Sequence, residues 1–194
     1  MTAMTGAQSA QAGAGPPLDD ATLVSRAREG DVRAYEQLVL RYQGPIFRLA
    51  VRMLASRTDA EDVVQEVFLT AWRRLAQLSE DAAFVGWLYR AATNRCLNVL
   101  RSRRPEVELD FEVADPPQRG GQPEHAAQVS EQLVALNRAL QQLTPQQRAC
   151  WLLREVHGRS YEEIGEIVGT NSTAVRGRIA RARAQLAEVM RPWR

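Results

Sequence analysis

The sequence predicts an all-α protein in which two small helical domains, residues 18–104 and 129–194, are joined by a flexible acidic linker, residues 105–128. No stretch alternates apolar and polar residues in the way that a half-buried β-strand does. Apolar residues instead recur three and four positions apart through both predicted domains, which is the spacing of an amphipathic helix. The segment between them lacks this periodicity, and its composition changes abruptly, which places the domain boundary there.

The composition is that of an ordinary globular protein. Of the 194 residues, 45% are hydrophobic and 25% are charged, so the chain has enough apolar residues to form cores. The net charge of +2 argues against a surface that is coated uniformly in positive charge for nucleic acid. The basic side chains are all arginine, apart from two histidines. Arginine favours bidentate contacts with phosphates and bases, and a GC-rich genome would produce the same bias, so both explanations stay open.

The sequence patterns do not indicate a metal site, a cofactor or a membrane segment. Cys96 and Cys150 lie far apart without a CxxC pair or a histidine cluster, so we expect two buried thiols. No apolar run reaches the ~20 residues that span a bilayer, and the start of the chain lacks the pattern of a signal peptide. We therefore expect a cytoplasmic protein without membrane insertion, metal or cofactor.

The first domain is expected to follow a disordered tail. Residues 1–17 are mostly Ala, Gly, Gln, Thr and Pro without apolar periodicity, and Met4 is an alternative start. From Asp19 to Arg104 the chain is expected to form successive helices. Breaks are predicted at four short polar stretches, REGD (28–31), YQGP (42–45), ASRTD (55–59) and LSED (78–81).

One predicted helix of the first domain has a strongly apolar side and a mixed opposite side. The apolar side, expected in the core, consists of Val63, Val64, Val67, Phe68, Ala71, Trp72 and Leu75. The opposite side carries Asp62, Gln65, Glu66, Leu69 and Arg73. A leucine among polar residues on an exposed face indicates a protein partner, although an ordinary solvated face has the same spacing.

The next predicted helix combines a core face with a second face suited to nucleic acid. The core face consists of Val85, Leu88, Ala92, Cys96 and Val99. The second face consists of Trp87, Arg90, Asn94, Asn98 and Arg101, and the helix ends in Arg103 and Arg104. Unstacked bases bind to aromatic rings and amides while their phosphates need cations, so this face is suited to single-stranded or melting DNA. Plain core packing of Trp87 is the alternative.

The linker, residues 105–128, contains six acidic residues, four prolines and a pair of glycines. Such a segment cannot bury enough apolar surface to offset the entropy of ordering it.

The second domain contains a predicted helix-turn-helix. Thr144 and Pro145 begin an upstream helix that includes Trp151, Leu152, Leu153 and Val156 as core residues, and His157 is expected as a residue of its C-terminal cap. Ser160 and Glu163 form a capping box, and Gly169 ends that helix. Asn171 caps the next helix, whose apolar stripe is Val175, Ile179, Ala182 and Leu186.

The apolar stripe decides which side chains of the last helix face outward. Thr173, Arg176, Gly177 and Ala180 fall opposite the stripe, and Arg178, Arg181 and Arg183 flank them. Small residues would allow close approach to a major groove, Arg176 could contact guanine, and the flanking arginines could bind phosphates. An exposed helix that merely carries arginine on its solvent side is the alternative.

Three motifs in this order resemble the bacterial RNA polymerase sigma factors of the extracytoplasmic-function group. They are DAEDVVQEVFLTAW, then FVGWLYRAATNRCLNVLRSRR, then LTPQQRACWLLREVHGRSYEEIGEIVGTNSTAVRGRIARARAQL. The resemblance covers about residues 20–104 and 129–190. It implies a factor that binds core RNA polymerase, directs it to promoters through the −10 and −35 elements, and helps to melt the DNA.

The resemblance also implies a role for each candidate site. The face of Asp62, Gln65, Glu66 and Leu69 would dock on the clamp helices of the polymerase β′ subunit. The −10 element would be recognised by Ser79, Glu80, Asp81, Trp87, Arg90, Asn94, Asn98 and Arg101. The −35 major groove would be read by Ser172, Thr173, Arg176, Gly177, Arg178, Ala180, Arg181 and Arg183, with another face of that domain on the β flap. An anti-sigma factor is a common partner in the group, and the free protein would be a monomer.

Two other classes of protein compete with this interpretation. An enzyme would need a phosphate-binding glycine loop, metal-ligand spacing or a catalytic partner for one of the two histidines, and the sequence shows none of these patterns. A helix-turn-helix repressor or response regulator would bind palindromic DNA as a dimer, whereas a sigma factor binds two dissimilar elements together with polymerase.

Overall fold

The computed structural model describes residues 18–103 and 123–191, with side chains from residue 131 onward in the second of these ranges. The helices are α1 (Asp20–Arg28), α2 (Val32–Leu54), α3 (Arg57–Arg74), α4 (Phe84–Ser102), α5 (Pro123–Gln142), α6 (Pro145–Glu155), α7 (Tyr161–Val168) and α8 (Ser172–Val189), with short 3-10 turns at Leu75–Gln77 and Asp81–Ala83. Within these ranges every element is helical, which confirms the all-α prediction. The predicted tail and residues 104–122 of the predicted linker lie outside the described residues.

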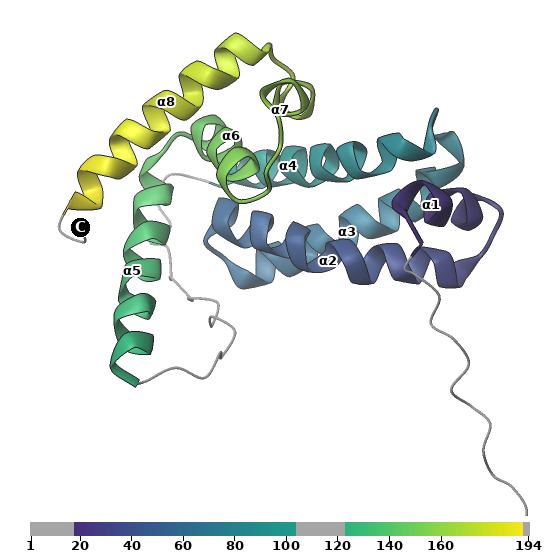
Figure 1. Ribbon diagram of the computed structural model, residues 1–194, viewed down its shortest axis with the longest axis horizontal. Helices are drawn as coiled ribbons and strands as arrows, with labels where there is room; N and C mark the ends of the chain where they lie inside the picture. Colours follow the sequence, from purple (N-terminus) through teal and green to yellow (C-terminus); the bar gives the residue numbers. More distant parts are fainter. Residues whose placement is uncertain (1–17, 104–122, 192–194) are drawn as a thin grey trace, which may run out of the picture.

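The first half of the chain, α1 to α4, is a bundle in which α2 packs against the other three helices (Figure 1). Side-chain caps begin its helices where polar residues precede the apolar pattern: Asp19 accepts from the backbone of Thr22, and Asp31 accepts from that of Ala34. The core beneath them includes Leu38, Ile46, Leu49, Phe84 and Leu88, all fully buried.

The break predicted at residues 42–45 is wrong, because α2 runs through Gly44 and Pro45 without ending. Proline removes one backbone donor and restricts the residue before it, which usually ends or kinks a helix. Here the apolar positions on the C-terminal side, Ile46, Leu49 and Met53, are fully buried and continue the same helical face. Tertiary packing along the whole helix thus outweighs the local preference of the Gly-Pro pair.

The boundary between the predicted linker and the second half also differs from the prediction. Helix α5 begins at Pro123, so residues 123–128, which were predicted as part of the linker, are helical. Proline is favoured at the first position of a helix because its missing N–H needs no partner there.

The second half ends in the predicted helix-turn-helix, formed by α7 and α8. The capping box of Ser160 and Glu163 is present, and Asn171 caps α8 as expected. Gly169 ends α7 in the left-handed conformation, with a φ of +69°. The turn also depends on Gly165, because a Cβ on this residue would lie 2.7 Å from the carbonyl oxygen of Thr170. A side chain at position 165 would therefore force the two helices apart.

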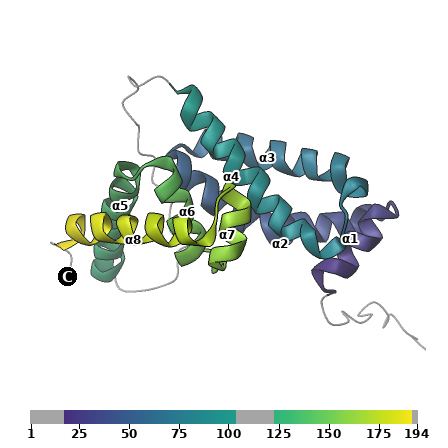
Figure 2. The same ribbon diagram turned by 90° about the horizontal axis from the view of Figure 1, so that it is seen from above.

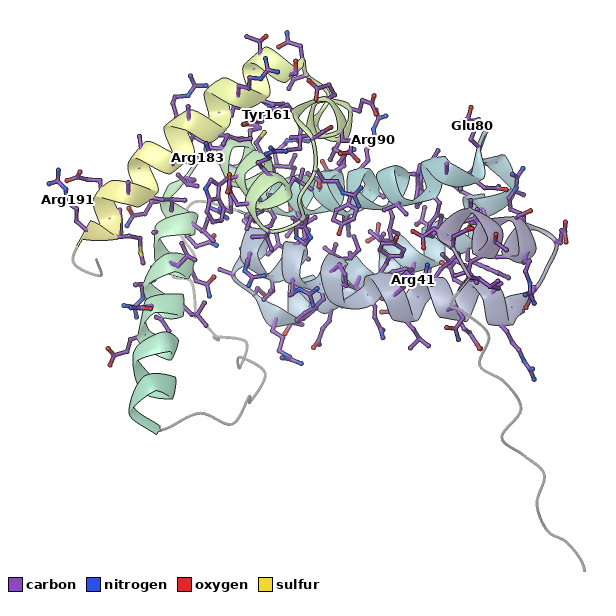
Figure 3. All side chains as sticks on the ribbon, viewed as in Figure 1. Arg41, Glu80, Arg90, Tyr161, Arg183 and Arg191 are labelled. Carbon is purple, nitrogen blue, oxygen red and sulfur yellow. The ribbon has the colours of Figure 1, made fainter. Side chains whose placement is uncertain are left out.

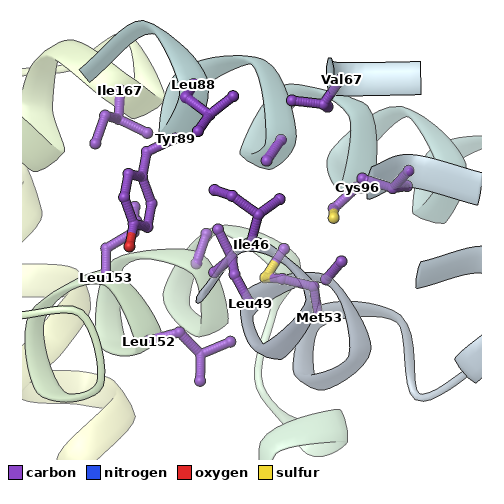
Figure 4. Packing of buried hydrophobic residues seen from close by; sticks show 14 of the residues in the cluster. Ile46, Leu49, Met53, Val67, Leu88, Tyr89, Cys96, Leu152, Leu153 and Ile167 are labelled. Carbon is purple, nitrogen blue, oxygen red and sulfur yellow. The ribbon is translucent and has the colours of Figure 1, made fainter. Parts of the chain in front are cut away.

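The two halves pack directly against each other. Helix α4 contacts α7 and α6, and α2 contacts α6 and α5, so the second half sits over one end of the bundle (Figures 1 and 2). Figure 4 shows the junction, where Leu153 and Ile167 of the second half surround Tyr89, with Leu49 of α2 nearby. We refer to this packing as the closed arrangement. Nothing in the periodicity of the sequence predicted it.

The apolar segments of the described residues are short or amphipathic, and none of their helices meets the length and hydropathy needed to cross a bilayer.

Candidate nucleic-acid and polymerase interfaces

The outward face of α8 matches the sequence prediction closely. The predicted stripe of Val175, Ile179, Ala182 and Leu186 is buried against α6 and α7. The exposed predicted residues are Thr173, Arg176, Ala180, Arg181 and Arg183, while Ser172 and Gly177 are half-buried. These residues project from the first four turns of the helix, which is the part of a recognition helix that meets a major groove.

Two arginines of this face are held by neighbours on the same half. The guanidinium of Arg176 lies 5.0 Å from the ring centre of Tyr161 and 3.8 Å from a carboxylate oxygen of Glu162. Arg183, labelled in Figure 3, donates to Glu155 over 2.6 Å. Both arginine side chains stay more than half exposed. Exposed pairs of this kind contribute little stability, so a DNA phosphate or base can replace the carboxylate at small cost.

Arg178 differs from the other arginines of the predicted row. It is half-buried, and its Nη1 is a buried atom without a hydrogen-bond partner in the described structure. Its guanidinium lies beside Cys150 of α6. Around the helix axis, position 178 lies closer to the centre of the buried stripe that begins at Val175 than positions 176 and 181 do. This spacing could have predicted that Arg178 is less exposed than Arg176 and Arg181. The structure therefore places Arg178 between helices, away from the outward face.

A broad apolar groove lies between α2 and α3, with a volume of about 750 Å³. Its walls come entirely from the first half and include Tyr35, Val39, Phe47, Val64, Gln65, Phe68, Leu69 and Trp72. Two of the four predicted polymerase-binding residues, Gln65 and Leu69, line this groove. The other two, Asp62 and Glu66, are exposed on the same helix, and Glu66 pairs with Arg95 over 2.7 Å.

Trp72 belongs to this groove, and its prediction as a core residue is wrong. Its side chain is 41% exposed, and its ring lies 4.8 Å from that of Tyr35. The Tyr35 hydroxyl donates to the carbonyl of Phe68 over 2.5 Å, which fixes the ring on which Trp72 rests. Trp72 lies three residues after Leu69, so the helical spacing could have placed both on one side. The neighbouring exposed Leu69 and Trp72 form the kind of apolar patch that marks a protein interface.

Six of the eight predicted −10 residues are exposed, and the other two, Asp81 and Trp87, are half-buried. Asn94, Asn98 and Arg101 are exposed, and Arg101 donates to Asn98 over 3.1 Å. Trp87 is half-buried against the core, in agreement with the alternative of core packing, while one edge lines a cavity together with Arg90. The loop residues Ser79, Glu80 and Asp81 lie before α4, and Asp81 pairs with Arg28 over 2.6 Å.

The cavity beside Trp87 has a volume of about 650 Å³ and lies between the two halves of the chain. Ser79, Trp87 and Arg90 line it from the first half, and Arg159, Glu163, Glu166 and Ile167 line it from the second. Figure 3 shows Arg90 beside α7 and Glu80 at the far end of α4. The backbone N–H of Ser160 donates to Glu163 over 2.7 Å and lowers the pKa of this carboxyl, so a carboxylate faces the cavity at neutral pH.

Both cysteines are buried thiols in the described structure, as the sequence predicted. Burial raises the pKa of Cys96 to about 12 and also raises the pKa of Cys150. Because the thiolate is the reactive form, neither side chain is set up to react with oxidants at neutral pH.

Val156, predicted in the core of α6, is 39% exposed, so that prediction is wrong. Val156 follows Glu155, the last residue of α6, so it does not continue the buried face of that helix. The described residues contain no group of three or more His, Cys, Asp or Glu side chains placed to hold a metal ion.

Two family models match the chain. The model of Sigma-70 region 2 matches residues 38–106, and that of Sigma-70 region 4 matches residues 133–186. The RNA polymerase sigma-H factor of Pseudomonas aeruginosa is 37% identical over 182 residues, which cover 89% of this chain and 94% of the relative. The ECF RNA polymerase sigma-E factor of Escherichia coli K12 is 36% identical over 184 residues, which cover 90% and 96%.

Two solved structures share the fold over most of the chain. The structure of CnrH in complex with the cytosolic domain of CnrY has a TM-score of 0.69 and 29% identity, covering 89% of this chain and 97% of that one. The sigma factor RpoE in complex with the anti-sigma factor NepR from Bartonella quintana has a TM-score of 0.68 over 81% of this chain and 96% of that one. Its identity of 23% supports the fold alone.

Proposed function

The chain belongs to the sigma-70 family, in its extracytoplasmic-function group, and we propose that its two halves divide promoter recognition between them. Sigma factors of this group direct core RNA polymerase to promoters, and this chain has the same function. RNA synthesis itself takes place in the polymerase, so the residues proposed below bind and position without catalysing. The polymerase works in the cytoplasm, which is where we place this chain.

The α2–α3 groove is the proposed docking site for the β′ clamp helices of the polymerase. The observation that carries this assignment is the exposed pair Leu69 and Trp72 beside an apolar groove of about 750 Å³. An aromatic and an aliphatic anchor of this kind are typical of the centre of a protein interface. The exposed carboxylates of Asp62 and Glu66 lie on the same helix and would supply a polar rim.

The −10 element is proposed to bind along α4 and the loop before it. Arg90 and Arg101 supply cations, Asn94 and Asn98 supply amides, and Trp87 supplies an aromatic edge, all on one helix. A base that leaves the stack during melting costs a few kcal/mol, which contacts with such side chains offset.

The −35 element is proposed to bind α8. Arg176 is exposed near the start of the helix and Arg181 near its middle, and the small side chain of Ala180 is also exposed. The helix N-terminus, capped by Asn171, brings Ser172 and Thr173 to the same surface. Because polymerase fixes the distance between the two halves, two modest DNA contacts combine into one tight contact that depends on the spacing.

An anti-sigma factor is the proposed regulatory partner. The sigma factor RpoE of Bartonella quintana was solved with its anti-sigma factor NepR, and CnrH with the cytosolic domain of CnrY. A partner that covered the α2–α3 groove would block the proposed polymerase site. We also propose that the free chain is a monomer, because its two halves bury their apolar surfaces against each other.

Arg176→Ala and Arg181→Ala are expected to weaken promoter binding in different ways. Arg176 is held over Tyr161, in a position to contact a base, so its loss should cost about 1 to 3 kcal/mol and relax the preference at one −35 base. Arg181 is exposed and is proposed to contact a phosphate, so its loss should weaken binding to all sequences about equally. Competition binding of the holoenzyme to promoters with single base changes measures both effects. Equal losses on every sequence for both variants would contradict the assignment of Arg176.

The promoter upstream of the chain's own gene provides the test of the proposed function. Purified core polymerase, with and without the chain, is incubated with this DNA, and unpaired thymines are mapped with permanganate. We expect unpairing around the −10 element and transcript synthesis only when the chain is present. If the chain binds this DNA as a dimer on a palindrome and opens nothing with polymerase, a repressor is the better explanation.

A further inference from the structure

We propose that the junction between the two halves binds a phosphate group. The donors come from both halves: Arg48 and Arg52 of α2, and His157 and Arg159 of the segment between α6 and α7. The ligand is inorganic phosphate or a small phosphate monoester. None of these four residues belongs to the surfaces proposed above for polymerase or promoter DNA, so the site is a further function and does not rest on the proposed one.

Tyr89 of α4 holds the two donors of the second half. The hydroxyl of Tyr89 lies 3.2 Å from Nδ1 of His157, and the centres of the two rings are 5.2 Å apart, edge to face. The guanidinium of Arg159 lies over the same tyrosine ring, 4.4 Å from its centre. Tyr89 is only 4% exposed, so both donors rest on a buried ring. They are held in place before a ligand binds, which lowers the entropy cost of binding.

Arg48 and Arg52 lie one turn apart on α2 and bring their charges to the same imidazole. Gln141 donates to the carbonyl of Arg52 over 2.9 Å, so this part of α2 lies directly against the second half. Burial, followed by the three nearby guanidinium groups, lowers the pKa of His157 to about 4. At neutral pH the cluster therefore consists of three cations and a neutral ring.

Acidic side chains balance little of this positive charge. Among the described side chains, no carboxylate lies within ion-pair distance of Arg48 or Arg52. Glu163 of α7 pairs with Arg159 over 3.1 Å. Burial and the charge of Arg48 lower the pKa of Arg52, as expected where cations crowd together away from water. A bound dianion would relieve this repulsion.

Two nitrogen atoms of the cluster are buried and have no hydrogen-bond partner in the described structure, Nε2 of His157 and Nε of Arg159. Glu163 accepts from Nη1 of Arg159 and leaves Nε free. When the hydroxyl of Tyr89 donates to Nδ1 of His157, the neutral ring carries its proton on Nε2 and offers a donor there. Buried donors in proteins normally have acceptors, so two of them against one tyrosine indicate that a ligand supplies the acceptor.

A phosphate group suits this set of donors. A guanidinium presents parallel N–H bonds that match two oxygens of a phosphate, and a tetrahedral phosphate has further oxygens for the imidazole. Its two negative charges match three cations better than the single charge of chloride or of a carboxylate does. Arg48 is exposed and Arg52 is half-buried, so the ligand can enter from solvent along α2. Because the donors belong to both halves, a bound phosphate would stabilise the closed arrangement.

Titration of the full chain with inorganic phosphate, followed through the ring protons of His157 in NMR spectra, tests the site. The variant His157→Gln identifies the signal. We expect a saturable shift with a dissociation constant on the order of 1 mM. Arg48→Gln and Arg52→Gln should each weaken binding about tenfold, because each removes a charge-assisted hydrogen bond.

Arg33→Gln is the matched control. Arg33 is exposed near the start of α2, so this variant loses the same charge from the same helix and should bind phosphate like the wild type. Potassium chloride at the same ionic strength should leave the His157 signal in place. An equal shift in chloride, an equal loss in Arg33→Gln and Arg48→Gln, or the absence of a saturable shift would overturn the proposal.

A parallel titration with AMP distinguishes the two sources of the phosphate group. Tighter binding of AMP than of inorganic phosphate, lost in Arg48→Gln, would support the site and identify a phosphate monoester as its ligand. Equal or weaker binding of AMP would support the site and identify inorganic phosphate.

Discussion

Core RNA polymerase is expected to bind the double variant Leu69→Ala/Trp72→Ala about a hundredfold more weakly than the wild-type chain. Both side chains are large, about half exposed, and lie in the groove between α2 and α3. Truncating an anchor of this type costs roughly 1 to 2 kcal/mol when it fills a partner's pocket, so two of them cost about 2 to 4 kcal/mol, a range that includes the roughly 2.8 kcal/mol of a hundredfold loss. Titration of a fluorescently labelled chain with core polymerase measures the affinity.

Leu40→Ala is the matched control for this experiment. Leu40 is 63% exposed, which is more than Leu69, yet it does not line the groove, so its variant should bind polymerase with wild-type affinity. Gln65→Ala should give a smaller loss than the double variant, because its side chain lies at the polar edge of the same groove. If the double variant and Leu40→Ala bind equally well, the α2–α3 groove is not the docking site.

Arg148→Met is expected to lower the free energy of unfolding by about 3 kcal/mol. Arg148 is 4% exposed, and its guanidinium donates to the carbonyls of Leu140 over 2.8 Å and Gln141 over 2.9 Å. It also reaches the carbonyl of Met53 in the other half. Methionine fills a similar volume but leaves these buried acceptors without a donor. Burial lowers the pKa of Arg148 to about 10, so the side chain is charged at neutral pH.

Urea unfolding, followed by circular dichroism, measures this loss. The midpoint should fall with an unchanged slope, because the variant exposes the same surface when it unfolds. Arg181→Ala is the control, since that arginine is exposed on α8 and should leave the midpoint where it is. A wild-type midpoint for Arg148→Met would mean that the carbonyl groups find water instead, and that Arg148 does not hold the halves together.

The helix-turn-helix could be predicted from the sequence almost residue by residue. Its caps, Ser160 and Asn171, act within a few positions along the chain, and the stripe that begins at Val175 follows from helical spacing. Both signals are local, so no knowledge of the rest of the fold is needed. The exposed position of Leu69 could be predicted for the same reason.

The contact between the halves could not be predicted from such patterns. Periodicity indicates that Leu88 and Leu153 are buried, but it does not say against which helix. The role of Arg148 could not be predicted either. Buried arginines are rare, and the acceptors of Arg148 are backbone carbonyls, which every residue carries and which no sequence pattern identifies. The path of α2 through Pro45 likewise depends on packing that lies far away in the sequence.

The distance between the two halves, measured between fluorophores on cysteines placed at the exposed positions Glu36 and Gln185, tests the central claim most directly. We expect a short distance in the free chain, where α4 contacts α7, and a long one in the complex with polymerase and open promoter, because polymerase is proposed to hold the two halves at the separation of the −10 and −35 elements. A complex that transcribes while the labels keep the short distance of the free chain would contradict this account.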